Sequence, residues 1–288
     1  MDYAPKEIAT PIRVPSTANL MIDSADRASG SAWNFQIVKQ KSILNGFFTR
    51  IGTTEVVLEW CEENVSSALG NTTISFDISG IAPNTYNGTQ TISVLSGFYT
   101  AAEMMNELVS QLNDLSGTTG TTWAMVQYQA GYYLEATDAF FEIGTERLAV
   151  QLDLDNAVSV SLSATETGVI PNCPDLRPYR YIDFVSPVLT YAQDVKDSST
   201  ATFDRDVLCR WYFSYDEQAP LDAYGFPILM GYTRFCLRRI FNPPKQIKWD
   251  TNLPIGNLNF QVFNDDGILL PVSSDRSNWL MTLQVSEV

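Results

Sequence analysis

The sequence contains no histidine among its 288 residues. Histidine is the usual general base near neutral pH and the commonest side-chain ligand of transition metals. Without it, a serine nucleophile such as Ser31, Ser96 or Ser186 would need lysine or an acid as its base. No G-x-S-x-G motif surrounds a serine in this chain. We therefore expect no enzymatic activity.

Cysteine is also scarce, and its four copies are far apart, without a C-x-x-C pair. This spacing argues against a zinc site or a redox motif, so we expect no metal and no cofactor. Cys61, Cys209 and Cys236 lie in apolar, strand-like runs and are predicted to be small buried hydrophobic residues. Cys173 lies in a proline-rich stretch.

Long apolar runs are missing as well, and positive charge is scarce. No apolar run reaches the roughly 18 residues that a membrane span needs, and the N-terminus lacks the pattern of a signal peptide. Lysine and arginine number 18 against 33 acidic residues, which gives a net charge of −15. Such a chain repels phosphate, so we expect no direct contact with nucleic acid. Charged residues make up only 18% of the chain, which favours a surface partly covered by partners.

What the sequence does contain is β-strand pattern, most clearly in Gly256–Val285. Apolar and polar residues alternate in Leu258–Val262 and again in Trp279–Val285. Between them, Asn264–Gly267 predicts a tight turn; a calcium loop is the weaker reading, because the twelve-residue ligand pattern is incomplete. A terminal strand stays ordered only when it is tied into a sheet. We therefore expect the C-terminus to pair with strands from far earlier in the chain.

The rest of the chain is also mainly β, with one change of period. Helical spacing appears in Ala101–Leu115, where Thr100 and Glu103 form a capping box, and a short second helix is predicted at Thr145–Leu152. A hairpin lies between them. Further strands are predicted at Trp33–Val38, Glu55–Cys61, Thr72–Ser79, Thr89–Leu95, 157–163, Tyr181–Ala192, Asp206–Tyr215 and Thr233–Phe241.

These patterns predict three regions. Residues 1–20, with Pro5, Pro11 and Pro15, read as an extended N-terminal arm or a disordered tail. Residues 21–96 and 157–288 form the β domain. Residues 97–156 form a small α+β insertion of helix, hairpin and short helix.

Four stretches in order carry a family resemblance: "IDSADR…WNFQIV", "ISVLSGFYTAAEMMNELVSQLN", "TWAMVQYQAGYYLEAT…FFEIGTERLAVQLDL" and "IKWDTNLPIGNLNFQVFNDDGILL…SNWLMTLQV". The series resembles the jelly-roll penton (vertex) and minor capsid proteins of large DNA viruses, virophages and polinton-like viruses. It departs from that pattern at Leu152-Asp153-Leu154, where the family has Leu-Gly-Phe, and residues 165–250 match no part of it. The resemblance implies an antiparallel jelly-roll β-sandwich, in which the first and last strands are neighbours.

The function implied by the resemblance is a structural component of an icosahedral capsid. The most specific version is a vertex protein that forms a homopentamer and sits in the virion after synthesis in the host cell. A minor capsid protein that cements the major capsid protein and other minor capsid proteins is the second version. A receptor- or carbohydrate-binding β-sandwich is the alternative of another class.

Two groups of side chains are candidate subunit contacts. One is basic and includes Arg234, Arg238 and Arg239, which could meet an acidic neighbour or simply form a polar strand face. The other is the aromatic pair Tyr224 and Phe226 in a loop rich in proline and glycine, because tyrosine is favoured at interfaces. That pair is equally the patch that a carbohydrate-binding protein would use.

Overall fold

The structure is a computed structural model. It describes residues 17–38, 49–80, 88–116, 121–128, 131–137, 139–152, 154, 158–163, 166–170, 175–190, 207–213, 235–248, 256–271 and 277–286.

The larger part of the molecule is a sandwich of two antiparallel sheets. The first sheet has the order β1-β17-β4-β14, with β15 also paired to β4, and the second has the order β13-β12-β16-β3-β2. The bounds in the first are β1 Thr17–Asp23, β17 Asn278–Ser286, β4 Arg50–Trp60, β14 Phe235–Ile240 and β15 Gln246–Lys248. Those in the second are β13 Val207–Tyr212, β12 Tyr181–Val185, β16 Asn257–Asn264, β3 Asn34–Val38 and β2 Ser29–Ser31.

This strand order is that of a jelly roll. When the eight main strands of the sandwich are counted in chain order, one sheet reads 1-8-3-6 and the other 5-4-7-2. The last strand, β17, lies between β1 and β4, and its register joins Ser286 to Thr17 on one side and to Arg50 on the other. The expected pairing of the C-terminus with early strands is therefore confirmed.

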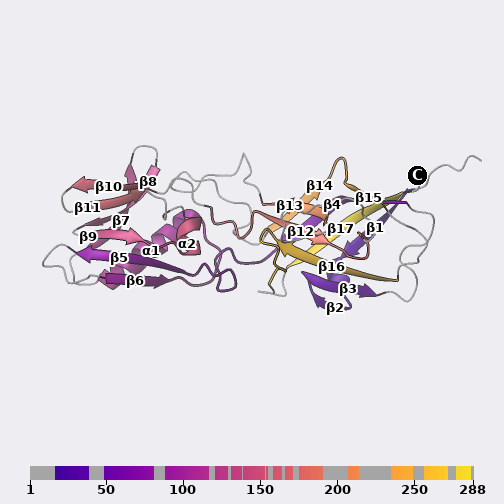
Figure 1. The fold of residues 1–288 in the computed structure, drawn as a ribbon, viewed down its shortest axis with the longest axis horizontal. Helices are drawn as coiled ribbons and strands as arrows, with labels where there is room; N and C mark the ends of the chain where they lie inside the picture. The colour runs from indigo at the N-terminus through magenta and orange to yellow at the C-terminus, as the bar shows by residue number, and fades with distance from the viewer. Residues whose placement is uncertain are drawn as a thin grey trace, which may run out of the picture.

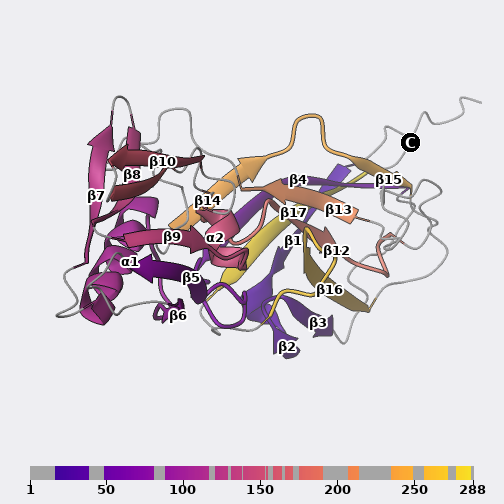
Figure 2. The same cartoon turned by 60° about the vertical axis from the view of Figure 1, so that its left-hand side comes forward.

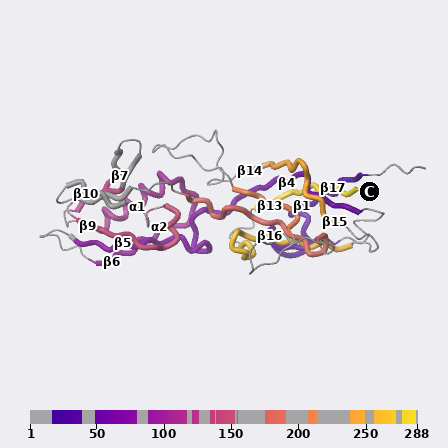
Figure 3. Tube along the Cα trace, turned by 45° about the horizontal axis from the view of Figure 1, so that its top comes forward, coloured from indigo at the N-terminus to yellow at the C-terminus, as the bar shows by residue number. Residues whose placement is uncertain are grey.

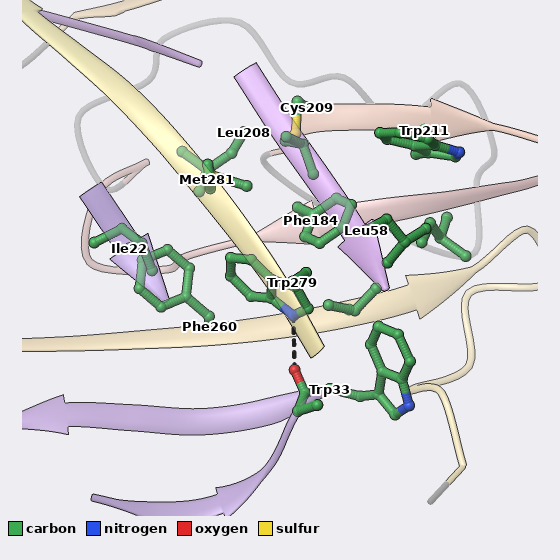
Figure 4. Close-up of a cluster of buried hydrophobic side chains, with 14 of the residues drawn as sticks. Ile22, Trp33, Leu58, Phe184, Leu208, Cys209, Trp211, Phe260, Trp279 and Met281 are labelled. Carbon is green, nitrogen blue, oxygen red and sulfur yellow. Dashed lines mark hydrogen bonds between the residues drawn. The ribbon is translucent and has the colours of Figure 1, made fainter. Parts of the chain in front are cut away.

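The sandwich closes over an aromatic core. Trp279 is fully buried, and its ring lies 5.0–5.5 Å from those of Phe35, Phe184 and Phe260. Its indole N–H donates to the backbone carbonyl of Ala32 at 2.7 Å, as Figure 4 shows. The alternation predicted for the terminal strands is present, since Trp279, Met281, Leu283 and Val285 are all buried.

A second set of elements has its own sheets and its own hydrophobic cluster. One sheet has the order β6-β5-β9 and the other β10-β11-β8-β7, and the cluster runs from Val65 to Leu176. We call residues 65–176 the distal unit. Its elements are β5 Thr73–Gly80, β6 Gly88–Ser93, α1 Ala101–Ser116, β7 Thr122–Tyr128, β8 Gly131–Thr137, β9 Ala139–Ile143, α2 Arg147–Gln151, β10 Val158–Ser163 and β11 Glu166–Ile170.

Both predicted helices are present. Thr100 and Glu103 bond reciprocally at the start of α1, at 2.9 Å and 3.1 Å, which confirms the capping box. The division at residues 97 and 156 stays a prediction as a division into domains. The pairings place β5, which precedes that range, between β6 and β9, and β11, which follows it, between β10 and β8.

The two parts lie end to end along the long axis of the molecule, and the chain crosses from one part to the other twice (Figure 1). The outward passage follows β4 and the return passage precedes β12, so the distal unit lies between the third and fourth strands of the jelly roll. The C-terminus lies at the end of the sandwich that faces away from the distal unit. Among the described residues, no helix is long and apolar enough to cross a membrane.

Candidate interaction surfaces

The two passages form a neck, made of segments 61–72 and 175–180, which includes both ends of the distal unit and whose two segments run close together in Figure 3. Arg147 at the start of α2 ties them to each other. One terminal nitrogen of its guanidinium donates to the carbonyl of Leu69 on the outward segment at 3.0 Å, and the other donates to the carbonyl of Pro178 on the return segment at 3.1 Å. One fixed, planar donor group therefore joins both passages to the distal unit.

Side-chain amides strengthen the same neck. Asn71 donates to the side chain of Gln151 at 2.7 Å, and Gln151 donates to the carbonyl of Arg177 at 3.1 Å. The amide of Asn64 forms two bonds with the backbone of Tyr99, at 2.7 Å and 2.9 Å. We infer that these bonds hold the distal unit in one orientation on the jelly roll.

The turn at Asn264–Gly267 forms as predicted. Gly267 has a φ of +79°, and the Asn264 side chain accepts from the backbone N–H of Ile268 at 2.7 Å. The carboxylate of Asp265 pairs with Arg180 at 3.0 Å, and this bond raises the pKa of the guanidinium. Asp265 thus helps to fasten the turn to the return segment of the neck.

The predicted subunit contacts are only partly described. Arg234, Tyr224 and Phe226 lie outside the described residues, so the basic cluster as a whole and the aromatic patch stay predictions. Arg238 lies on β14, forms an ion pair with Glu55 of β4, and leaves 64% of its side chain exposed.

Arg239 points to the other side of the same strand. Its guanidinium carbon lies 5.8–6.0 Å from the ring centres of Trp211, Tyr212 and Phe241, within the range of a cation–π contact. It therefore bridges β14 and β13, the outermost strands of the two sheets on this side. The two adjacent arginines occupy different surfaces.

Arg238 lies on the outer face of the first sheet, among exposed apolar side chains. Met21 is 79% exposed, Ile240 63% and Leu280 40%. The register places Asp23, Leu280, Val57 and Arg238 in one row of this face, and Met21, Thr282, Glu55 and Ile240 in the next, so Thr282 and Glu55 lie between Met21 and Ile240. The face therefore mixes exposed apolar side chains with polar and charged ones, a composition that a subunit contact can have.

The outer face of the second sheet carries a buried ion pair that the sequence did not reveal. Asp183 on β12 and Arg210 on β13 are direct cross-strand partners, joined by two bonds of 2.7 Å and 2.9 Å. The Asp183 carboxylate raises the pKa of the guanidinium, mainly through these bonds. Arg210 also stacks on the ring of Tyr181 at 3.9 Å, and Tyr212 beside it is half-exposed. Arginine and tyrosine are, with tryptophan, the side chains enriched among the residues that dominate binding energy at protein interfaces.

Charge is divided unevenly between the two units. Residues 65–176 contain twelve acidic residues and one basic residue, Arg147, whereas the rest of the chain contains 21 acidic and 17 basic residues. The exposed Asp77 and Glu142 even face each other across β5 and β9, an arrangement that destabilises a sheet. The distal unit therefore carries most of the net negative charge of the protein.

A search of solved structures finds the same architecture in selenomethionine-labelled mavirus penton protein. The two chains superpose with a TM-score of 0.53 over 96% of this chain and 100% of the other, at 12% sequence identity. The two proteins share a fold. The likeness therefore includes the distal unit as well as the jelly roll, and it supports the predicted resemblance at the level of the fold. No family model matches the sequence, and no curated protein matches it.

Proposed function

We propose that this protein is a structural component of an icosahedral viral capsid and that it forms the vertex as a closed ring of five copies. The observation that carries the proposal is the likeness in fold to mavirus penton protein over almost the whole of both chains. Its work is assembly, and its partners are its own copies, the major capsid protein and other minor capsid proteins. Its location is the virion.

The two outer sheet faces suit a ring. A ring of identical subunits needs two different surfaces on each copy, which meet head to tail. The first sheet offers a mixed face, on which the exposed Met21, Leu280 and Ile240 lie beside Arg238, and the second offers Tyr181, Arg210 and Tyr212. We assign these faces, with Arg238 and Arg239, to the contact between neighbouring copies. The acidic distal units repel one another, which also favours contacts through the jelly roll.

The native mass of the purified protein tests the ring. Five copies of a 32.1 kDa chain give a particle of roughly 160 kDa, which analytical ultracentrifugation resolves from a monomer. Replacing Met21 by lysine buries a charge in the proposed contact and should convert the ring to monomers.

Phe140→Lys is the matched control, because Phe140 is also a large exposed strand residue but lies on the distal unit. We expect it to leave the ring intact. A ring in which Met21→Lys has no effect contradicts the assignment of the first sheet face. A wild-type protein that is monomeric contradicts self-assembly and favours the minor capsid role, in which binding to the major capsid protein is the next measurement.

Removing residues 1–16 is expected to impair assembly while the monomer stays folded. The jelly roll begins at Thr17, the first residue of β1, whose partner Ser286 remains in place. The circular dichroism spectrum should therefore stay β-rich, while the yield of the ring or of the capsid-bound protein falls. Loss of the β spectrum would show that the arm belongs to the core, and unchanged assembly would exclude it as an assembly arm.

A further inference from the structure

The outer edge of β6 in the distal unit has no partner strand. β6 is the first strand of the sheet β6-β5-β9, and it pairs with β5 alone. It lies at the margin of the distal unit in Figure 2, and among the described residues no strand continues the sheet beyond it. The distal unit therefore presents an open sheet edge at this margin.

The register shows which backbone groups face the open edge. The N–H of Val94 donates to the carbonyl of Thr72, just before β5, at 2.8 Å. In an antiparallel pair, every second residue bonds to the partner strand, and the others turn their N–H and carbonyl groups away from it. Counting back from Val94, the residues that face the open edge are Thr89, Thr91 and Ser93. All three are exposed.

Nothing in the sequence of β6 protects this edge. Natural edge strands are commonly blunted by charged side chains, proline or a bulge, because bare backbone groups invite another strand. β6 has the sequence GTQTIS, with neither charge nor proline, and its register with β5 runs without a bulge. The edge is therefore open to strand addition.

Negative charge gathers where this edge ends. Tyr99 turns back on the chain, so that its hydroxyl donates to the carbonyl of Leu95 at 3.0 Å. Burial and the nearby carboxylates of Glu107, Glu103 and Glu63 raise the pKa of this hydroxyl. None of the three carboxylates forms an ion pair with a basic side chain in the described part of the chain. They are therefore able to pair with a cation from outside.

The charge of the distal unit determines which segment suits the edge. Arg147, its one basic residue, already donates to both segments of the neck. Asp77, directly opposite Thr89, is exposed and adds negative charge to the same sheet. Just beyond β6, Leu95 leaves 79% of its surface exposed. The edge thus suits an extended segment with lysine or arginine side chains and offers it one apolar contact.

We propose that β6 binds an extended basic segment of a partner protein, which joins the sheet as a further strand. Backbone hydrogen bonds to Thr89, Thr91 and Ser93 provide the affinity and fix the register. The basic side chains of the segment meet the three carboxylates around Tyr99, which select for positive charge.

Two other occupants fit less well. A second copy would bring another acidic distal unit against this one. In the N-terminal arm of a neighbouring copy, residues 1–16 contain two acidic and two basic residues, so their side chains carry no net charge. The three prolines of the arm also lack the N–H that a strand ladder needs.

Fluorescence anisotropy of the whole protein with a labelled peptide tests the edge. The probe alternates threonine with lysine, and its counterpart has glutamate in place of lysine. We expect saturable binding of the lysine peptide only, and weaker binding as salt is added.

Neutralising the carboxylates tests their role. Glu63→Gln, Glu103→Gln and Glu107→Gln together should weaken binding of the lysine peptide about tenfold. Glutamine keeps the capping box at the start of α1. The matched control removes the same charge from exposed positions of the jelly roll, by Asp26→Asn, Glu59→Gln and Asp266→Asn together.

Amide hydrogen exchange, read by mass spectrometry with electron-transfer fragmentation, locates the peptide. Binding should slow exchange at Thr89, Thr91 and Ser93 and leave Gln90 and Ile92 unchanged, because the amides of these two already bond to β5. Thr91→Pro removes one donor from the open edge and leaves the bonds to β5 in place, so it should weaken binding about tenfold or more. Thr91→Val keeps the donor and is the control.

The outcomes separate clearly. Selective binding of the lysine peptide, with protection of the three edge amides, supports the site. Equal binding of the glutamate peptide or of a peptide of residues 1–16, protection outside β6, or full binding by both the carboxylate variant and Thr91→Pro would overturn it. Protection of the edge amides at high protein concentration without peptide would overturn it by assigning the edge to a second copy. None of these results depends on whether the protein forms a ring, so failure here leaves the capsid proposal standing.

Discussion

Trp279→Asp is expected to abolish soluble expression. The indole is fully buried, contacts three aromatic rings and donates to the carbonyl of Ala32. Removing a buried tryptophan side chain alone costs about 3–5 kcal/mol. The new carboxylate adds a desolvation penalty of several kcal/mol, because it would lie among the buried aromatic rings that Trp279 now contacts. Together these losses approach or exceed the roughly 5–15 kcal/mol by which a domain is stable.

The adjacent residue provides the control for this experiment. Leu280 follows Trp279 on β17 but points to the outer face of the sheet, where it is 40% exposed. Leu280→Asp should therefore remain soluble and folded, with a sharp melting transition. The comparison is made by soluble yield and thermal denaturation of both variants. Soluble Trp279→Asp with a sharp melting transition would show that the last strand does not hold the core together.

Arg210→Met is expected to lower the free energy of unfolding by about 3 kcal/mol or more. Asp183 has only 1% of its side chain exposed, and the variant removes the guanidinium that binds both of its oxygens. Breaking a buried ion pair from one side is costly, because the remaining charge stays in a poorly solvated place. Urea denaturation of the full-length protein measures the loss.

Two further variants show whether the loss of stability comes from the Asp183 carboxylate, which Arg210→Met deprives of its guanidinium. Asp183→Asn combined with Arg210→Met removes both charges and should recover part of the stability. Arg238→Met breaks the exposed pair with Glu55 and should cost at most about 1 kcal/mol, although it should weaken assembly. If Arg210→Met and Arg238→Met were equally mild, the pair between Asp183 and Arg210 would not stabilise the second sheet.

The elements of the fold could be predicted from local pattern alone. Alternation identified β16 and β17, and the capping box of Thr100 and Glu103 identified the start of α1. These signals are local, since they depend on which face of a strand or helix meets the core. The same signals do not say which sheet a strand joins. The alternating run at Thr72–Ser79 looks like any other jelly-roll strand, yet as β5 it pairs with β9 in the distal unit.

The interaction surfaces were harder to predict, because they depend on register. Asp183 and Arg210 are 27 residues apart, and nothing in either strand indicates that they face each other. Arg238 and Arg239 are adjacent and look alike in sequence, but they lie on opposite sides of β14. The exposed side chains of Met21, Leu280 and Ile240 reach one sheet face from three strands that are distant in sequence. Only the tertiary pairing brings these side chains together.

The position of β17 also sets the order in which the chain can fold during synthesis. This strand is made last, yet it lies inside its sheet, between β1 and β4. The jelly roll therefore cannot close until translation is nearly complete. The distal unit is continuous in sequence, from residue 65 to 176, so it can fold on the ribosome while β1 to β4 wait for their partners. We expect nascent chains that stop near residue 180 to hold a folded distal unit beside an exposed, unfinished sheet, the stage at which this protein is most in need of a chaperone.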